Sequence, residues 1–315
     1  MTDKIAYSRH DDIVVLRIEN PPVNALSQAV RQGLAEGMDR AEAEEGVRAV
    51  MIVGEGRAFI AGADITEFGK PPMEPHLPNL CNRIEASPLL VVASMHGVSL
   101  GGGLEVALSA HYRIAQPTAR VGLPEVHLGL IPGAGGTQRL PRLIGVEPAL
   151  DAITTGRHIK APQALEMGIV DRVEEGDPQE VGLAYVRELL DSGAERRPIC
   201  DMPAPAPIDW DAAYEATLKK GRGQISPAED VRAVLRRRRH IDVALPVLAL
   251  QFVGPRERHL EQVGLGVDRR VERIRPSQRG VKQVEQTAAG MEGDGLRSLG
   301  PEPDPEPGAE VGGLA

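Results

Sequence analysis

Residues 97–105 read Gly-Val-Ser-Leu-Gly-Gly-Gly-Leu-Glu, a glycine-rich turn that leads into a mostly apolar stretch ending near Ala110. The apolar residues 88–95 before it predict a buried strand. We expect a helix to begin within the three glycines and to continue through Ala110. Strand, glycine turn and helix in this order are typical of an α/β fold with right-handed crossovers. The backbone N–H groups at the start of such a helix favour a developing anion, although a glycine turn can also serve only close packing.

The same alternation extends on both sides of this turn. Residues 13–18 form a short apolar run that ends at Asn20 and two prolines, which predicts a strand. Ser27 is a suitable N-cap for a helix over residues 29–44, where apolar residues recur at helical spacing. Further strands are predicted at residues 47–53, 112–115, 119–122 and 168–173, and further helices at residues 138–144, 148–155, 162–167 and 178–191. The fold class is therefore α/β.

Two glutamates lie at glycine-rich turns. Glu105 ends the run quoted above, and Glu125 ends the sequence Gly-Leu-Pro-Glu of residues 122–125. A carboxylate pair can take and give protons at one carbon–carbon bond, while bare glycine backbone can approach a substrate oxygen. Most glutamates are instead solvated surface groups. The apolar neighbours of both residues favour the catalytic interpretation. Residues 59–65, Phe-Ile-Ala-Gly-Ala-Asp-Ile, offer a second stretch of exposed backbone.

The composition excludes several classes of function. A formal net charge of −9 argues against a nucleic-acid partner bound through its phosphates. Cys81 and Cys200 lie far apart with no histidine or cysteine at ligand spacing, so we expect neither a disulfide framework nor a metal site. No apolar run approaches the roughly 18 residues of a membrane span, and the first residues lack a signal pattern. The last three residues, 313–315, are not the peroxisomal Ser-Lys-Leu address. We expect a cytoplasmic protein.

The composition changes after Arg197. Residues 198–207 are rich in proline and linker-like, and helices are expected at residues 210–220 and 227–236. Residues 300–308 alternate proline with mostly acidic residues, a composition typical of disorder. We therefore divide the chain into a core of residues 1–195, a linker and helical extension of residues 196–260, and a low-complexity tail of residues 261–315.

Taken in order, these segments resemble the enoyl-CoA hydratase (crotonase) superfamily. Its signature is similar to the Ala-Gly-Ala-Asp of residues 61–64, the Gly-Gly-Gly-Leu-Glu of residues 101–105 and the Pro-Glu of residues 124–125. Residues 132–140, Pro-Gly-Ala-Gly-Gly-Thr-Gln-Arg-Leu, complete it. The opening Asn-Pro-Pro-Val-Asn-Ala-Leu-Ser of residues 20–27 looks most like the hydratase half of multifunctional fatty-acid β-oxidation enzymes. The resemblance implies a ClpP-like spiral of repeated ββα units with a C-terminal helical region.

The resemblance also implies a reaction. A 2-enoyl-CoA hydratase adds water to trans-2-enoyl-CoA and gives 3-hydroxyacyl-CoA. By this likeness the backbone N–H groups of Ala61 and Gly102 form the oxyanion hole. Glu125 supplies the proton to C2, and Glu105 helps to position and deprotonate the water. Losing one oxyanion donor costs roughly 2.7–4 kcal/mol in such sites.

Further contacts to substrate are expected from turn residues. By resemblance the turn Ala61, Gly62, Ala63 and Asp64 lines the CoA portion through backbone atoms, and the Asp64 side chain is alternatively a cap for the next segment. Gly133 is a further backbone partner for Glu125 or the substrate, with a purely packing role as the alternative. CoA is part of the substrate, so no separate cofactor is expected. Stand-alone relatives form homotrimers and hexamers, while multifunctional ones often do not.

Several rival functions are open. A Δ3-Δ2-enoyl-CoA isomerase of the same fold needs one acid at the Glu125 position, and the retention of Glu105 favours hydration. A non-catalytic acyl-CoA-binding or RNA-associated relative is disfavoured by the intact acids and the negative charge. The four arginines of residues 236–239 are better explained as a solvated stretch. Residues 264–266, Gly-Leu-Gly, lack the third glycine of a dinucleotide loop because Arg269 stands there.

Overall fold

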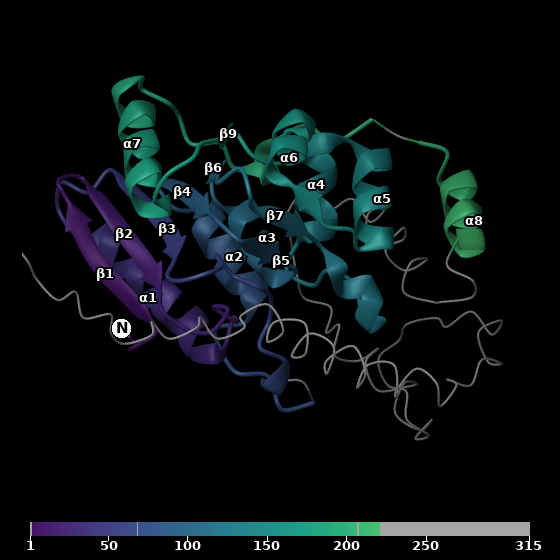
Figure 1. The fold of residues 1–315 in the computed structure, drawn as a ribbon, viewed down its shortest axis with the longest axis horizontal. Coiled ribbons are helices and arrows are strands. Elements are labelled where there is room, and N and C mark those ends of the chain that lie inside the picture. Colours follow the sequence, from purple (N-terminus) through teal and green to yellow (C-terminus); the bar gives the residue numbers. More distant parts are fainter. Residues whose placement is uncertain (1, 68, 207, 221–315) are drawn as a thin grey trace, which may run out of the picture. The chain divides into compact units, whose positions relative to one another are not determined.

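The computed structural model describes residues 2–67, 69–206 and 208–220, all within the unit Met1–Val253 (Figure 1). The predicted helix over residues 227–236, the four-arginine run and the tail of residues 261–315 lie outside the described residues. Much of the predicted extension does so too, and the three-part division of the chain stays a prediction. In the described part of the chain, no helix has both the length and the apolar character needed to cross a membrane.

The larger sheet contains six strands of the described residues. They are β1 (Ile5–His10), β2 (Ile13–Ile18), β3 (Ala49–Gly54), β4 (Leu90–Met95), β6 (Tyr112–Ala115) and β9 (Arg172–Val173). Their order across the sheet is β1-β2-β3-β4-β6-β9. β1 and β2 form an antiparallel hairpin, and every other neighbouring pair is parallel. Parallel pairs need crossover connections, and helices supply most of them.

Alternate residues of the central strands pack on opposite faces of this sheet, as the pleat requires. On one face, Val50 and Ile52 of β3 join the main core with α1 (Gln28–Ala43), α2 (Leu77–Glu85) and α3 (Gly102–Ser109). On the other face, Met51 and Val53 pack against α7 (Pro178–Asp191) (Figure 1). Because both faces are covered, every residue of β3 and β4 is buried.

A smaller sheet positions the two glutamates. It consists of β5 (Val98–Leu100), β7 (Arg120–Gly122) and β8 (Ile159–Lys160), in the order β5-β7-β8. β5 and β7 run parallel, with Leu100 paired to Gly122. Since parallel strands end at the same edge of a sheet, the segments that follow β5 and β7 emerge side by side. Glu105 belongs to the first segment and Glu125 to the second.

Apart from the 3-10 segment η1 (Ile65–Glu67), which lies between β3 and α2, the remaining described helices follow the small sheet or connect its strands. They are the 3-10 segments η2 (Pro124–Leu128) and η3 (Ile199–Asp201), and the helices α4 (Gly136–Ile144), α5 (Val146–Thr155), α6 (Ala161–Met167) and α8 (Trp210–Lys220). α3 contacts both α2 and α4. This places α4, and the glycine turn before it, next to the helix that carries Glu105.

Most predicted elements are confirmed, several to the residue. Ser27 caps α1 by accepting a hydrogen bond from Val30 N, and α3 begins inside the triple glycine. Four strands and helices were missed, as were the three 3-10 segments. β8 has only two residues. β1 is an edge strand without an alternating apolar pattern, β5 is only three residues long, and α2 follows a proline-rich stretch. The predicted strand of residues 168–173 is shorter, because only Arg172–Val173 pair with β6.

Candidate active site

Gly101 brings the two predicted catalytic glutamates to one turn. It links β5 to α3 with φ 52° and ψ −125°, a conformation that favours glycine. Its N–H donates to Gly122 O at 2.9 Å, and its carbonyl accepts from Glu105 N at 3.0 Å. A Cβ at this position would lie 3.2 Å from Glu125 Oε1. The Glu125 carboxylate therefore lies against the turn from which the Glu105 helix begins.

Glu105 is a buried carboxylate held by backbone. Glu105 is 2% exposed, and its Oε1 accepts hydrogen bonds from Ala134 N at 2.7 Å and Gly136 N at 2.8 Å. Burial raises the pKa of Glu105, while these two N–H groups and the nearby Arg139 charge act in the opposite direction. Within the described residues, its second oxygen, Oε2, accepts no hydrogen bond. Glu105 is thus fixed by one oxygen and can hold water with the other.

Glu125 has different surroundings. It lies in the 3-10 segment η2, directly after Pro124, and is half-buried. Its backbone carbonyl accepts a hydrogen bond from Leu130 N at 3.0 Å, which closes the turn around it. This acid therefore belongs to a short turn, whereas Glu105 belongs to a regular helix.

The N–H of Ala61 was expected to be an oxyanion donor, but it already has a hydrogen-bond acceptor within the protein. The Ala61 N–H donates to Val23 O at 3.1 Å and is already engaged. Among the described residues, no acceptor pairs with the N–H of Ala63. A Cβ built on Gly102 would lie 3.9 Å from this Ala63 nitrogen, so the two residues are neighbours. The N–H of Ala63, rather than that of Ala61, is therefore the one left for an acceptor near Gly102.

Two leucines that the sequence did not single out lie beside these donors. A Cβ on Gly102 would lie 2.7 Å from Leu77 Cδ2 and 3.2 Å from Leu26 Cδ1. Leu26 also donates its N–H to Gly62 O at 2.9 Å, which ties the donor loop to the segment before α1. A side chain at position 102 would have to displace the methyl groups of these leucines. Leu77 begins α2, a helix that was not predicted because prolines surround its first turn.

Arg31 of α1 anchors the chain leading to Leu77. It is 8% exposed and donates to the carbonyls of Leu26, Met73 and Pro75 and to Glu67 Oε2. Glu67 in turn accepts from Gln28 N. A basic residue on the apolar face of a predicted helix was the available signal for this role.

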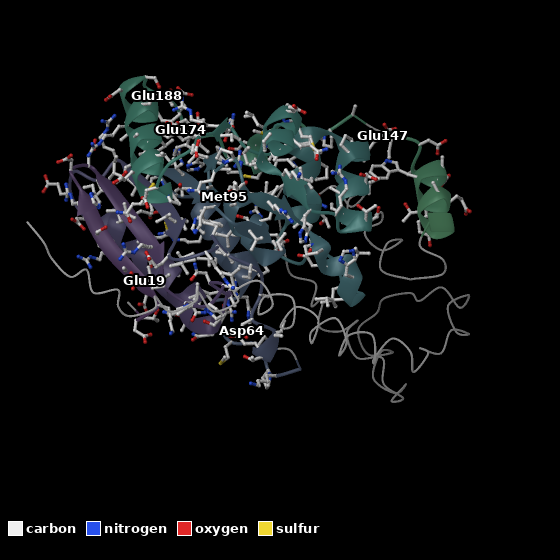
Figure 2. All side chains as sticks on the ribbon, in the orientation of Figure 1. Glu19, Asp64, Met95, Glu147, Glu174 and Glu188 are labelled. Carbon is white, nitrogen blue, oxygen red and sulfur yellow. The ribbon has the colours of Figure 1, made fainter. Side chains whose placement is uncertain are left out.

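The remaining predicted site residues are placed as follows. Asp64 Oδ1 accepts from Thr66 N at 2.9 Å, so its side chain caps η1, which confirms the capping alternative. Figure 2 shows Asp64 on the opposite side of the described part from Glu174 and Glu188. A Cβ on Gly133 would meet nothing within 4 Å. The turn containing Gly133 holds Glu105 through the N–H groups of Ala134 and Gly136. The expected partnership of Gly133 with Glu125 or the substrate stays a prediction.

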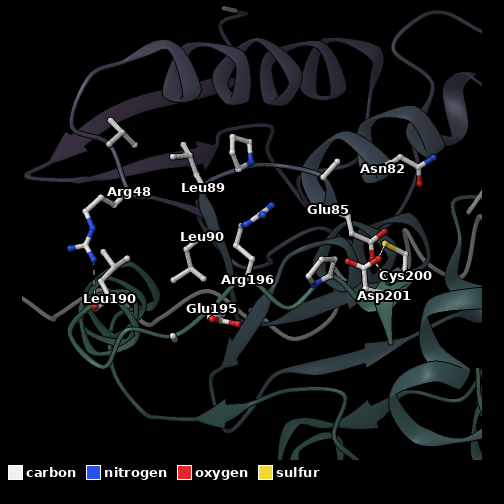
Figure 3. Close-up of a pocket in the computed structure, with 15 residues that line it drawn as sticks. Arg48, Asn82, Glu85, Leu89, Leu90, Leu190, Glu195, Arg196, Cys200 and Asp201 are labelled. Carbon is white, nitrogen blue, oxygen red and sulfur yellow. Dashed lines mark hydrogen bonds between the residues drawn. The ribbon is translucent and has the colours of Figure 1, made fainter. Parts of the chain in front are cut away.

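A separate groove of about 1040 Å³ lies away from both acids (Figure 3). Its lining includes Arg48 and Leu90 near the starts of β3 and β4, Leu190 of α7, and Glu85 and Cys200. None of the predicted site residues lines it. In the described ranges, no three His, Cys, Asp or Glu side chains are grouped so that they could hold a metal ion.

Comparisons with known proteins agree with this geometry. The family model described as enoyl-CoA hydratase/isomerase matches residues 8–199. The peroxisomal bifunctional enzyme of Danio rerio is 47% identical over 226 residues, which cover 70% of this chain and 32% of that protein. A probable enoyl-CoA hydratase of Bacillus subtilis (strain 168) is 42% identical over 193 residues, 59% of this chain and 74% of the relative. The chain thus spans about a third of the bifunctional relative.

Solved structures support the fold. The crystal structure of enoyl-CoA hydratase from Bacillus anthracis is 30% identical, with a TM-score of 0.55, and the match covers 75% of this chain and 92% of that one. This confirms the expected crotonase fold.

The expected cytoplasmic location is wrong. The relatives from Danio rerio and Cucumis sativus are named peroxisomal and glyoxysomal, not cytoplasmic. The pattern from which the cytoplasm was inferred was an absence of signals, and such an absence carries little information. The family model that matches residues 8–199 and the fold lead to one conclusion: this chain belongs to the enoyl-CoA hydratase/isomerase (crotonase) family.

Proposed function

We propose that this chain hydrates trans-2-enoyl-CoA thioesters to 3-hydroxyacyl-CoA in fatty-acid β-oxidation. One observation carries the proposal: the Glu125 carboxylate lies against Gly101, the residue from which the helix of Glu105 begins, and the neighbouring residues Gly102 and Ala63 offer backbone N–H groups. An acid pair next to two backbone donors is the arrangement that addition of water to a conjugated thioester requires.

The oxyanion donors act on the thioester oxygen. As water bonds to C3, negative charge moves through C2 to this oxygen, where the N–H groups of Ala63 and Gly102 stabilise it. Gly102 is the first residue of α3, so the helix dipole adds to the effect. Leu26 and Leu77 lie against the same glycine and provide an apolar wall for the acyl chain.

The two acids handle the protons. Glu105, fixed through Oε1, holds the water with Oε2 and takes one of its protons as the oxygen bonds to C3. Glu125 delivers a proton to C2. One acid gains a proton and the other loses one, so the pair carries the same number of protons before and after the reaction. As neighbouring carboxylates, the two acids also titrate as a unit.

The test is turnover of crotonyl-CoA by the full chain, followed by the loss of ultraviolet absorbance of the conjugated thioester. Hydration that disappears in the Glu125→Gln variant supports the proposal. A well-folded chain that leaves crotonyl-CoA unchanged would overturn it. The homotrimer or hexamer of stand-alone relatives remains a prediction, which sedimentation of the same sample would test.

A further inference from the structure

A buried ion pair lies behind Glu105. Arg139 of α4 is fully buried and Glu85, at the end of α2, is 4% exposed. The Nη2 and Nε atoms of Arg139 donate to Glu85 Oε2 at 2.8 and 3.2 Å. A buried pair of this kind is weak evidence for stability, because removing two charges from water costs about as much as their attraction returns. A role other than stability therefore has to be considered.

Arg139 is connected to Glu105 through one residue. Its Nη1 donates to the carbonyl oxygen of Ala134 at 2.8 Å, while the N–H of Ala134 donates to Glu105 Oε1 at 2.7 Å. The second N–H on this oxygen comes from Gly136, two residues further on. Arg139 thus holds the carbonyl that lies between the two N–H groups that hold Glu105.

Glu85 is fixed independently of the turn. Its Oε1 accepts from Cys200 N at 3.0 Å, and its backbone carbonyl lies 3.1 Å from His111 Nε2. Asn82, one turn earlier on α2, accepts from Arg139 Nη2 at 3.0 Å. Figure 3 shows Asn82 and Glu85 together on the lining of the groove, with Cys200 beside Glu85. Arg139 is therefore held from α2 on one side and holds the turn of residues 134–136 on the other.

We propose that the Glu85–Arg139 pair is a positioning device for Glu105. It fixes the turn of residues 134–136 so that both N–H groups bind Oε1 and Oε2 is left to the water. This inference rests on the proposed hydration, since only a reaction with a held water needs Glu105 in one orientation. Neither residue touches substrate.

Apart from the second acid, Glu125, few charged groups of the described residues face Glu105. On α4 the charge is that of Arg139, and on α2 the titratable groups are Glu85 and the thiol of Cys81. Burial raises the pKa of Cys81 to about 12, so it is neutral at neutral pH. The Arg139 charge lowers the pKa of Glu105 against the larger effect of burial. Removing Arg139 raises this pKa further, so ionised Glu105 then requires a higher pH.

The experiment compares three variants of the full chain with the wild type. Glu85→Leu combined with Arg139→Met removes both charges and leaves no unpaired one in the core. Arg139→Lys keeps the charge but loses the planar fork that reaches Glu85 and Ala134 together. The matched control is Arg113→Met with Asp171→Leu, which removes another buried arginine and its acid, 3.4 Å apart, without touching residues 134–136. Melting temperature, kcat, KM and the pH profile of crotonyl-CoA hydration are measured for each.

The expected result is a loss of about 100-fold in kcat for the Leu/Met variant with KM little changed, the scale of a misplaced catalytic group. The acid limb of the pH profile of this variant moves to higher pH. The Lys variant has a lower kcat, but the acid limb of its pH profile does not move. The control variant keeps the wild-type kcat and pH profile.

If the Leu/Met and Lys variants fold and keep the wild-type kcat and pH profile, this inference is overturned while the proposed function stands. The same holds if the control variant loses as much kcat as the Leu/Met variant. If the Leu/Met variant does not fold, the Lys variant decides by its kcat. A wild type that does not hydrate overturns the proposed function, and this inference with it.

Discussion

Glu105 and Glu125 follow neighbouring parallel strands, yet their surroundings differ. Glu105 is on a regular helix, almost fully buried, with one oxygen held by two backbone N–H groups. Glu125 is half-buried in a 3-10 segment and lies against Gly101. A rigidly held carboxylate suits the orientation of a water molecule, and one on a short turn suits proton delivery. The difference teaches that two like residues at one turn can have separate tasks.

The largest expected effect is at Glu125. Glu125→Gln removes the proton donor to C2 and should lower kcat by roughly 10²–10⁴-fold with little change in KM. Turnover of crotonyl-CoA is the measurement. The matched control is Glu147→Gln on α5, an exposed glutamate far from Asp64 in Figure 2, and it should retain wild-type rates. Near-normal turnover by the Glu125 variant would remove this acid from the mechanism.

A somewhat smaller effect is expected at the backbone donors. Replacing the Ala63 peptide N–H by an ester oxygen deletes one hydrogen bond to the thioester oxygen, worth roughly 2.7–4 kcal/mol, or about 10²–10³-fold in kcat. The same exchange at Ala61 should chiefly lower stability, because that N–H donates to Val23 O. Equal kcat losses at the two positions would restore Ala61 as an oxyanion donor.

The smallest expected effect is on stability. Glu105→Gln should raise the free energy of unfolding at neutral pH by about 0.5–2 kcal/mol, because the burial that raises the pKa of Glu105 penalises its ionised form. Protonated Glu105 carries no such cost. The advantage of the variant should therefore be small in acid and grow as pH rises from the ordinary glutamate pKa through the raised one. Urea unfolding across this range is the measurement, and an advantage that shrinks with rising pH would contradict the account.

The local parts of this site were predictable from sequence. The start of α3, the cap at Ser27 and the two acids depend on glycines, prolines and apolar runs within a few residues of each other. The fold class followed from the same short-range patterns, and the crotonase fold from the resemblance.

The parts that failed depend on contacts between distant segments. Ala61 and Ala63 look alike in sequence, and only the pairing of Ala61 with Val23 separates them. The pairing of Arg139 with Glu85 joins residues 54 apart, and the signature run of residues 132–140 that contains Arg139 does not reveal this partner. Gly133 was expected to partner Glu125 or the substrate, and only the contact of α3 with α4 shows that the turn after Gly133 binds Glu105.

The most direct test of separate tasks is the ratio of two activities in Glu105→Ala. Hydration of crotonyl-CoA needs a held water, whereas isomerisation of a 3-enoyl-CoA needs only a proton moved by Glu125 at the oxyanion donors. Both rates are measured on one sample, with Glu125→Gln in parallel. The account predicts that Glu105→Ala loses hydration at least about tenfold more than isomerisation, while Glu125→Gln loses both. Equal losses of the two activities in Glu105→Ala would contradict it.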